Sequence, residues 1–525
     1  MCLSKRSELR HIDPKAKIER WDILDSLSKR SELRHIDPKA KIERWDILDS
    51  LSKRSRAQLN SLEQKGFRRE VSNMKKVLSA DVLSPILAYM RLDAPHKMIL
   101  ESIPREKENA RFSIVAYRPV SEVKFEHGIL YYNDQIVEED PLNFLNRITV
   151  KTKTSEELPF NGGAIGFVGY DLIGLYENIG SIPEDTIGTP DLHFFLYESY
   201  VIFDHKKEKV YVVEENLYSG RSEAEQASSL EQVLEQLARP AKEEFQDKDL
   251  HALHFHNHLE QKEFEEMVAL ARDYIRKGDM FQCVLSQRFS ADFSGKPLDY
   301  YRNLRVTNPS NYLYFYDFGE YQIIGASPES LVSVKDRVVT TNPIAGTRPR
   351  GIDEEADRQL AADLTGDPKE VAEHRMLVDL GRNDIGRIAQ NGSVEVTKYM
   401  EVEFFRYVMH LTSVVKGQLL PGLASIEALK ATLPAGTVSG APKIRAMKRI
   451  YEAEKEKRGV YAGAIGYLSV TGDLDFAIAI RTMILKNKKA YVQAGAGIVY
   501  DSIAENEYQE TVNKAKSMTR IGEEG

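Results

Sequence analysis

The stretch GAIGYLSVTGDLDFAIAIRTMILKNKKAYVQA, residues 463–494, decides the fold class of this chain. Three runs within it, 463–470, 476–485 and 490–494, alternate apolar with polar residues closely enough to predict antiparallel strands. We expect a helix from about Pro442 before these runs and another from Glu505 after them. Because runs of strands are interrupted by helices without a regular strand–helix alternation, the pattern favours an α+β fold.

Weaker signals extend this pattern toward the N-terminus. Apolar residues at helical spacing, closed by Gly278, predict a helix over residues 264–275, and further helices are expected from Pro368 and from Ile426. A charged, helix-prone stretch at residues 221–249 is typical of a connector. The remaining expected strands are 98–100, 113–116, 129–136, 162–170, 199–213, 282–289, 312–316 and 321–324.

The N-terminus contains an exact repeat, in which residues 4–27 recur unchanged as residues 28–51. Solenoid repeats drift in sequence and need about three units to bury their faces, so this identity indicates a recent duplication or an artefact. The repeat is charged and each copy contains Asp-Pro, so we expect residues 1–70 to be a tail that is disordered or forms short helices. The rest is expected to divide into residues 71–250 and 251–525.

Composition argues against several classes of protein. The formal net charge of −8 argues against a nucleic-acid surface, and the two cysteines, Cys2 and Cys283, cannot build a disulfide framework or a cysteine-based zinc site. Apolar runs fall short of the roughly 18 residues that cross a bilayer, and the N-terminus lacks the apolar stretch of a signal peptide. We therefore expect a cytoplasmic protein that binds neither nucleic acid nor a membrane.

Two acidic pairs at the same spacing are the strongest chemical feature of the sequence. Glu370 and Glu373 share a face of one expected helix, and Glu507 and Glu510 repeat this spacing in another. Four carboxylates brought together would repel unless a cation lay among them, and all-oxygen ligation suits Mg²⁺. Alternatively, Glu370 belongs to a capping box and Glu510 forms an ordinary surface pair with a lysine four residues on.

Glycine-rich segments and one arginine indicate an anion site. Residues 344–351, 433–443 and 493–499 expose backbone N–H groups and let the main chain approach an anionic ligand closely, although such segments are also plain turns. None of them fits the phosphate-binding P-loop or the dinucleotide fingerprint. Arg481 lies inside the apolar run 476–485, where a buried arginine needs a carboxylate partner from the protein or from a substrate.

Taken together, these segments resemble the chorismate-utilising enzymes, which include anthranilate, aminodeoxychorismate, isochorismate and salicylate synthases. The resemblance is strong over residues 255–520 and weaker over 71–250, and it implies an α+β fold with two antiparallel β-sheets packed between helices. It also implies that residues 71–250 are a regulatory subdomain and 251–525 the chorismate-binding catalytic domain. The matching motifs are PIAGTR (343–348), EHxMLVDLGRND (373–384), LPAGTVSGAPK (433–443), AGAGIV (494–499) and ExxExxxK (507–514).

The resemblance implies a role for individual residues. Glu373 and Glu510 would bind Mg²⁺ directly, with Glu370 and Glu507 completing the acidic site. The ring carboxylate of chorismate would be held by Gly346, Thr347, Gly495, Gly497 and Lys514, and the enolpyruvyl carboxylate by Arg481 and Tyr461. The implied catalytic residues are His410 beside the leaving hydroxyl, Thr437 in contact with the substrate, Glu329 at a position used as an acid by water-adding relatives, and Gln282.

Two departures from the family motifs favour one reaction. Ala345 stands where aminodeoxychorismate synthases commonly carry a nucleophilic lysine, and an alanine cannot form that covalent intermediate. Gln282 stands where isochorismate and salicylate synthases use a lysine to deprotonate water, and an amide is no base at neutral pH. Both favour the branch that makes anthranilate and pyruvate from chorismate and ammonia, the first committed step of tryptophan biosynthesis. Aminodeoxychorismate synthesis and a non-catalytic, tryptophan-sensing relative are the alternatives.

The resemblance also implies a partner and an inhibitor. A glutamine amidotransferase subunit (component II) would supply the ammonia, because neither cysteine is a convincing glutaminase nucleophile. Feedback inhibition by L-tryptophan is expected, although the departure at Asn311, where proline is common, leaves a structural remnant as the alternative. The residues that match the inhibitor motifs of the family are Glu101, Ser102, Asn308, Pro309, Ser310, Tyr312 and Leu313.

Overall fold

The computed structural model describes residues 73–81, 83–102, 111–151, 158–240, 253–405 and 408–519. Contacts divide the chain into two units, Met1–Glu70 and Val71–Gly525. The prediction for the repeated tail therefore lies outside the described residues.

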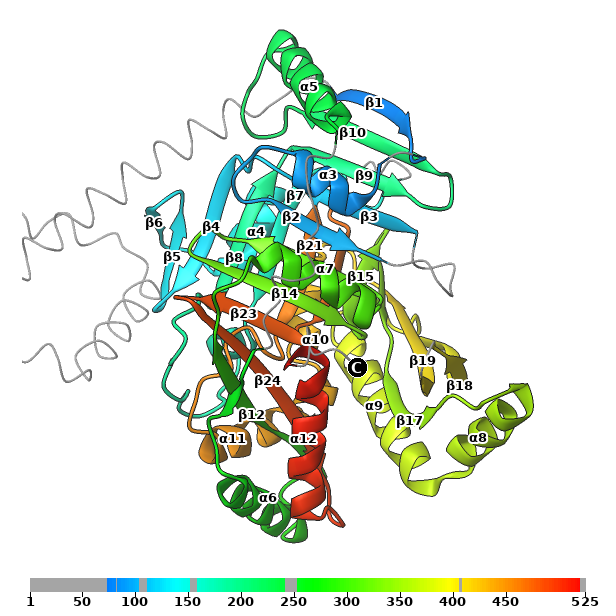
Figure 1. Ribbon diagram of the computed structural model, residues 1–525. Coiled ribbons are helices and arrows are strands. Elements are labelled where there is room, and N and C mark those ends of the chain that lie inside the picture. Colours follow the sequence, from blue (N-terminus) through cyan, green and yellow to red (C-terminus); the bar gives the residue numbers. More distant parts are fainter. Residues whose placement is uncertain are drawn as a thin grey trace, which may run out of the picture. The chain divides into compact units, whose positions relative to one another are not determined.

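Two antiparallel sheets form the framework, and they confirm the predicted fold class (Figure 1). The first sheet has the order β1 (Asn73–Ser79), β10 (Lys209–Glu215), β9 (Ser199–Asp204), β3 (Phe112–Ala116), β2 (Met98–Glu101), β13 (Tyr312–Asp317), β14 (Tyr321–Ser327), β23 (Thr482–Lys486), β24 (Lys489–Ile498), β12 (Gln282–Asp292) and β11 (His256–Asn257), with β20 (Gly440–Ala441) paired to β12. Strands from both sides of residue 250 therefore share this sheet.

The second sheet is built in the same way. Its order is β17 (Ile344–Pro349), β19 (Val408–Gln418), β16 (Val338–Thr341), β15 (Ser330–Lys335), β22 (Leu474–Ile478), β21 (Ala464–Ser469), β7 (Gly163–Val168), β8 (Leu192–Tyr197), β4 (Ser121–Glu126), β5 (Ile129–Tyr132) and β6 (Gln135–Val137), with β18 (Glu395–Phe404) paired to β19. Every strand pair within the two sheets is antiparallel.

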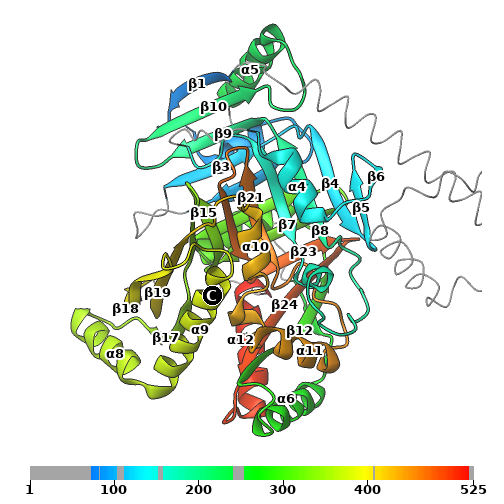
Figure 2. The same ribbon diagram turned by 180° about the vertical axis from the view of Figure 1, so that it is seen from behind.

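Helices cover the outer faces of the two sheets, as Figures 1 and 2 show. Apolar residues of α3 (Pro85–Arg91), α5 (Glu223–Ala238), α7 (Pro297–Thr307) and α12 (Ala504–Thr519) pack on the first sheet. Those of α4 (Pro141–Thr149), α9 (Pro368–Gly386) and α10 (Ile426–Thr432) pack on the second. α11 (Lys443–Ala453) lies against β12 and β20 of the first sheet and packs there through Ala446 and Ile450. The cluster that contains Ile114, Phe167, Ile323 and Ile465 fills the space between the sheets.

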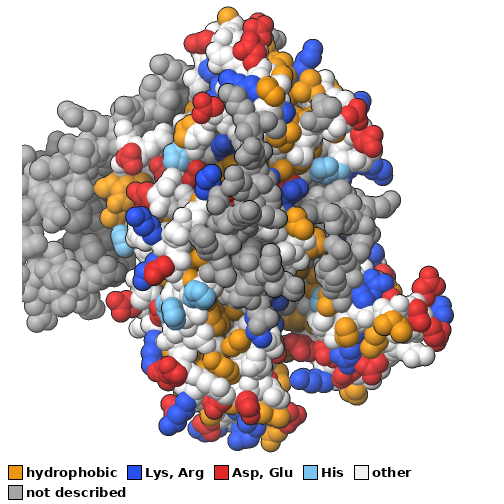
Figure 3. Space-filling model, in the orientation of Figure 1, with side chains coloured by type: hydrophobic (Ala, Val, Ile, Leu, Met, Phe, Trp, Pro, Cys, Tyr) orange, Lys and Arg blue, Asp and Glu red, His pale blue; other side chains and the backbone are white. Residues whose placement is uncertain are grey.

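The remaining helices are short or peripheral. α6 (Gln261–Arg276) buries Phe264, Met267, Val268 and Ala271, which is the apolar face that the sequence predicted. α8 (Glu354–Gly366) precedes α9, and short 3₁₀ helices span Tyr170–Leu175 and Gly436–Val438. No helix of the described residues is long and apolar enough to cross a membrane. On the face drawn in Figure 3, acidic and basic side chains of the described residues are interspersed rather than gathered by sign.

The chain passes from one sheet to the other at defined points. It was expected to run as one strand over 476–485, but β22 ends at Ile478 in the second sheet and β23 begins at Thr482 in the first. The prediction of a single strand was wrong because alternation reports burial and cannot distinguish one sheet from two facing ones. A second crossing lies between β14 and β15. The crossings bond to each other, since the Ile478 amide donates to the Glu329 carbonyl (3.0 Å) and the Ala326 amide donates to the Arg481 carbonyl (3.0 Å).

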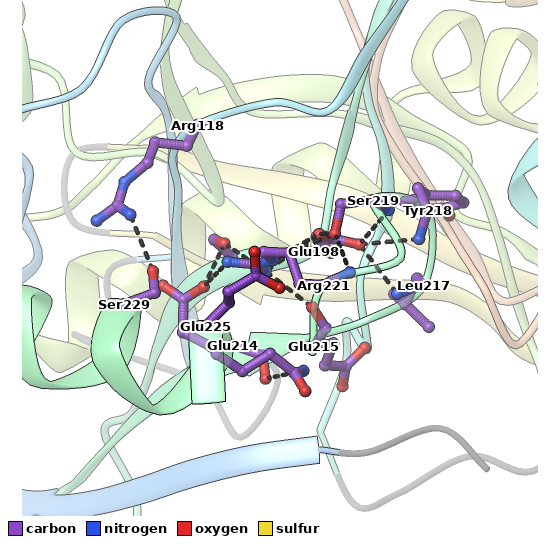
Figure 4. A network of polar contacts seen from close by, with 12 residues as sticks. Arg118, Glu198, Glu214, Glu215, Leu217, Tyr218, Ser219, Arg221, Glu225 and Ser229 are labelled. Atoms are coloured by element: carbon purple, nitrogen blue, oxygen red, sulfur yellow. Dashed lines mark hydrogen bonds and ion pairs between the residues drawn. The ribbon is translucent and has the colours of Figure 1, made fainter. Parts of the chain in front are cut away.

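A third crossing, between β8 and β9, carries a buried polar network (Figure 4). The Glu198 carboxylate accepts backbone N–H bonds from residues 217, 218 and 219 at 2.8–3.2 Å. Arg221 donates to Glu198 (3.1 Å) and to Glu214 (2.8 Å), which are 1% and 0% exposed. One guanidinium therefore neutralises two buried carboxylates.

We predict that Arg221→Ala lowers the free energy of unfolding by about 3–5 kcal/mol, because it leaves two buried carboxylates without a cation. Urea unfolding measures this change. Arg358→Ala is the matched control, since that arginine pairs with Glu355 while both side chains are more than 60% exposed, and it should change stability by less than about 0.5 kcal/mol. Equal stability of the two variants would contradict the account.

Candidate functional site

The site begins at the two bonded crossings, which place Glu329 and Arg481 side by side in the fold. Glu329 is partly buried, and its Oε1 accepts a hydrogen bond from the Thr437 hydroxyl at 2.8 Å. Burial raises the pKa of Glu329 to about 7, against the opposing effects of Thr437, Lys514 and Arg481. The carboxyl group therefore exchanges a proton near neutral pH, which is the property of a general acid or base.

Arg481 lines a cavity of about 460 Å³ together with residues of α12. The other lining residues are Asn506, Gln509, Glu510, Asn513, Lys514 and Ser517. Burial lowers the pKa of Arg481, while the negative groups of Tyr461, Glu329 and Glu510 raise it. No side chain in the described part of the chain accepts a hydrogen bond from its guanidinium, so its donors are available to an anionic ligand.

Glycines of β24 make room for two site residues. An ideal Cβ at Gly495 would lie 2.8 Å from the Tyr461 hydroxyl oxygen, and one at Gly497 would lie 2.7 Å from Gln282 Nε2. Larger residues would push both side chains away. Lys514 donates to the Gly495 carbonyl at 3.1 Å, so α12 and β24 are joined at the predicted carboxylate site.

A second group of predicted residues gathers where β17 meets β19 and α9. His410 Nδ1 lies 2.8 Å from the Gly346 carbonyl oxygen and 3.0 Å from the Thr347 hydroxyl. Gly346 has φ +71°, and an ideal Cβ there would lie 3.1 Å from a carboxylate oxygen of Glu370. Glu370 bonds to Arg348 at 3.3 Å, and burial raises its pKa.

The four glutamates are brought near one another only in part. Gln282 Nε2 donates to Glu373 at 3.1 Å, which joins α9 to β12. Burial and the repulsion of Glu510 raise the pKa of Glu507, while Lys369 of α9 lowers it from across the site. Within the described residues, no three acidic, histidine or cysteine side chains lie close enough to hold a metal ion as they stand. Mg²⁺ stays a prediction.

Of the two alternatives to a metal site, the capping box at Glu370 does not form, whereas the pair of Glu510 with a lysine does. Asp367 caps α9 by accepting from the amides of residues 369 and 370, but Glu370 turns to Arg348 instead of closing a capping box. The pair Glu510–Lys514 forms at 2.6 Å. The donor set nevertheless fits a divalent ion chemically, because it is all carboxylate. Burial is the main cause of the raised pKa values of Glu370 and Glu507, and the repulsion of Glu373 and Glu510 adds to it, which a cation would relieve.

The predicted inhibitor residues come from segments that the first sheet brings together. Glu101 at the end of β2 pairs with Leu313 of β13, so Ser102 lies beside the loop that contains Pro309 and Ser310. Glu101 accepts from Tyr301 and Arg305 at 2.7 and 2.9 Å. At the two ends of this loop, Asn308 donates to the Ser517 carbonyl at 2.7 Å, and Tyr312, the first residue of β13, donates to Asp475 at 3.0 Å.

Comparison with known proteins identifies the family. Residues 96–520 match the family of chorismate binding enzymes. The chain belongs to this family. It is 55% identical over 452 residues to anthranilate synthase component 1 of Lactococcus lactis subsp. lactis, covering 85% of this chain and 99% of the relative. It is 43% identical over 465 residues to component 1 of Pseudomonas aeruginosa, covering 84% and 93%.

Solved structures agree with the fold. The crystal structure of anthranilate synthase component I from Streptococcus pneumoniae TIGR4 is similar with 71% sequence identity and a TM-score of 0.76, covering 86% of this chain and all of that one. The isochorismate synthase MenF from Escherichia coli, at 19% identity, shares the fold with a TM-score of 0.66 and covers 89% of this chain and 99% of its own.

Some residues that organise this chorismate-binding enzyme were missed in the sequence. Arg348 bonds to Asp363 and Asp367 at 2.6 and 2.9 Å as well as to Glu370. Lys443, the first residue of α11, donates to Asp384 at 2.7 Å and ties α11 to α9. The sequence did contain a signal for the pair of Lys443 and Asp384. Both residues lie in motifs rich in apolar residues, where a buried charge needs a partner of opposite charge.

We predict that Glu329→Gln stabilises the protein at alkaline pH. The folded pKa of about 7 lies above the usual 4.5, so the wild type loses stability as the pH rises from about 4.5 to about 7, and this loss is complete above pH 7. The variant should exceed the wild type by up to about 3 kcal/mol at pH 8 in urea unfolding, and this gain should shrink between pH 7 and pH 4.5. An advantage that is the same at pH 8 and pH 4.5 would refute the raised pKa.

Proposed function

We propose that the chain is the large, chorismate-converting subunit of an anthranilate synthase, which makes anthranilate and pyruvate from chorismate and ammonia. The observation that carries the proposal is the hydrogen bonding of the Gln282 side-chain amide. Its Nε2 donates to Glu373, and its Oε1 is buried without a hydrogen-bond partner among the described residues. An amide cannot deprotonate water, but an unpaired acceptor suits a nucleophile that carries N–H groups. The similarity to proteins named anthranilate synthase component 1 supports this choice.

Chorismate is a dianion, and the proposal assigns each carboxylate to a set of donors. Arg481 and Tyr461 hold the enolpyruvyl carboxylate, which supplies the missing acceptor for the buried guanidinium. Gly346, Thr347, Gly495, Gly497 and Lys514 hold the ring carboxylate. The close packing at both β24 glycines supports this assignment, because the main chain can approach the ligand only where no Cβ intervenes.

Glu370, Glu373, Glu507 and Glu510 are the residues that would hold Mg²⁺, which supplies a Lewis acid and a template for the bound carboxylate. The protein residues perform the proton transfers. Ammonia adds at ring carbon 2 as the 4-hydroxyl leaves with a proton as water, giving aminodeoxyisochorismate. Glu329 holds a proton near neutral pH, and His410 lies beside the leaving group in the assignment taken from the family. Loss of the carbon 2 proton and of pyruvate then makes the ring aromatic.

A second subunit is part of the proposal. The similar proteins are named component 1, which implies a further component, and the resemblance to the family implies that this component is a glutamine amidotransferase, which would supply the ammonia. Cys283 cannot act as a glutaminase nucleophile, because it is fully buried and burial raises its pKa to about 12. Cys2 lies outside the described residues. We place the reaction in the cytoplasm.

Aminodeoxychorismate synthase is the closest alternative and would give a different product from the same substrate. Ala345 lies within β17, paired with Leu411, and offers no side-chain nucleophile at the position where that activity commonly has a lysine. A non-catalytic relative is the other alternative. It would be expected to lack an acidic or basic site residue, yet each predicted one is present.

The test is the appearance of fluorescent anthranilate from chorismate, Mg²⁺ and ammonium in the absence of glutamine. We expect Glu373→Gln and Glu510→Gln to lower kcat/KM at least about 100-fold and EDTA to abolish turnover, because each carboxylate contributes to the ion site. Glu355→Gln on α8 is the control, as this exposed carboxylate should leave the rate unchanged. Near-normal rates in both site variants, or in EDTA, would overturn the metal assignment.

Inhibition by tryptophan is tested separately. We expect micromolar to millimolar L-tryptophan to inhibit the wild type, and Ser102→Leu to raise the inhibitory concentration at least about tenfold by filling the space beside the 308–313 loop. Ser294→Leu, at an exposed serine outside the predicted site, should respond as the wild type does. Activity that is insensitive to tryptophan in the wild type would instead favour a structural remnant.

A further inference from the structure

Arg458 is a fully buried arginine that contacts three segments of the candidate site. Its side chain is 0% exposed, and it forms a buried ion pair with Glu454, donating from Nε at 2.8 Å and from Nη2 at 2.6 Å. Nη1 donates to the Val438 carbonyl at 2.7 Å, and Nη2 donates to the Val284 carbonyl at 2.6 Å. Neither Arg458 nor Glu454 lies in a motif that the sequence analysis singled out.

Each tethered segment carries a residue of the proposed reaction. Val438 follows Thr437, whose hydroxyl donates to Glu329. Val284 lies two residues after Gln282 on β12. The guanidinium also lies 5.6 Å from the ring centroid of Tyr461, whose hydroxyl occupies the space that a Cβ on Gly495 would enter. The rigid guanidinium thus fixes where two backbone segments and one ring lie relative to each other.

The ion pair is anchored on its far side as well. One oxygen of Glu454 accepts from both the amide and the hydroxyl of Ser286, at 2.8 and 2.9 Å. β12 is therefore held at residue 284 by Arg458 and at residue 286 by Glu454. A buried ion pair adds little to stability compared with an apolar replacement of similar size, because desolvation offsets the attraction. Stability alone is therefore a weak explanation for this arrangement.

We propose that Arg458 is a positioning residue for the reaction, which holds Thr437, Gln282 and Tyr461 in their working arrangement through the carbonyls of Val438 and Val284 and the ring contact. Its effect is indirect, since its hydrogen bonds go to Glu454 and to backbone carbonyls. The planar fork of an arginine reaches two carbonyls and a carboxylate at once, whereas a lysine offers one point charge. The proposal rests on the proposed function for its assay.

The test compares Arg458→Lys with Arg221→Lys in the anthranilate assay. Arg221 is the matched control, because it also joins buried glutamates and a carbonyl, that of Glu215, and contacts no candidate site residue. Both variants should unfold at a lower temperature than the wild type. At a temperature where both are folded, Arg458→Lys should lower kcat at least about tenfold with a smaller change in KM, and Arg221→Lys should keep kcat within about twofold.

The pH profile separates positioning from a general loss of packing. The hydrogen bond from Thr437 lowers the pKa of Glu329, as do Lys514 and Arg481. If Thr437 is displaced, the pKa of Glu329 rises. The part of the kcat–pH profile that follows the titration of Glu329 should then move to higher pH. The same displacement predicts that Thr437→Ala lowers kcat much less in the Arg458→Lys variant than in the wild type. Both changes remove the same interaction, the hydrogen bond from Thr437 to Glu329, so their effects should not add.

Each outcome decides the inference. If Arg458→Lys does not fold, Glu454→Gln replaces it and should show a smaller loss of kcat with the same upward shift of the limb. Wild-type kcat and pH profile in Arg458→Lys, or in Glu454→Gln where that replaces it, would overturn the positioning role. The same holds if Arg458→Lys and Arg221→Lys lose kcat equally. A wild-type protein that forms no anthranilate defeats the proposed function, whereas an active wild type with unaltered variants defeats only this inference.

Discussion

The backbone hydrogen bonds between two sheet crossings are the constraint on which the candidate site depends. The Ile478 amide bonds to the Glu329 carbonyl and the Ala326 amide bonds to the Arg481 carbonyl, so the two crossing segments are fixed to each other as firmly as neighbouring strands. Their side chains, an acid and a base, are both only partly exposed, and that of Arg481 lines the cavity beside α12. Arg481 has φ +50°, a backbone conformation that a side chain of this size rarely adopts, and the pairing of β22 and β23 in different sheets imposes it.

The other half of the site is attached by side chains. α9 packs on the second sheet through Val378 and Ile385 and is tied to the start of α11 by the pair of Asp384 and Lys443. Among the described residues, one hydrogen bond joins the glutamates of α9 to β12, and Gln282 donates it to Glu373. Polar side-chain contacts of this kind are easier to break than paired strands, so the acidic half is the part of the site whose geometry can adjust to a ligand.

The sequence predicted the parts of the site that depend on local spacing. Glu370 and Glu373 share a face because three residues span almost one helical turn, and Asp367 caps their helix because its side chain meets free amides at the first turn. The α+β class followed from alternation, which is equally local. The break of residues 476–485 between two sheets was not predictable in this way, since both strands are buried and the pattern is the same on either sheet. The role of Arg458 was missed because its pair with Glu454, four residues earlier, has the spacing of an ordinary surface pair. Its other partners, the Val438 and Val284 carbonyls, are backbone groups that leave no trace in side-chain spacing.

The orientation of one amide links the acidic site to the choice of nucleophile. Glu373 is an acceptor only, so the Gln282 amide must point its nitrogen toward it, and its oxygen must therefore face the other way. That oxygen is buried and unpaired within the described chain, and an unpaired buried acceptor is costly until a donor reaches it. Ammonia brings three N–H donors, and water brings two but needs a base that this position lacks. In the proposed reaction, the carboxylate that binds the metal thus also decides, through a glutamine, which small molecule can attack.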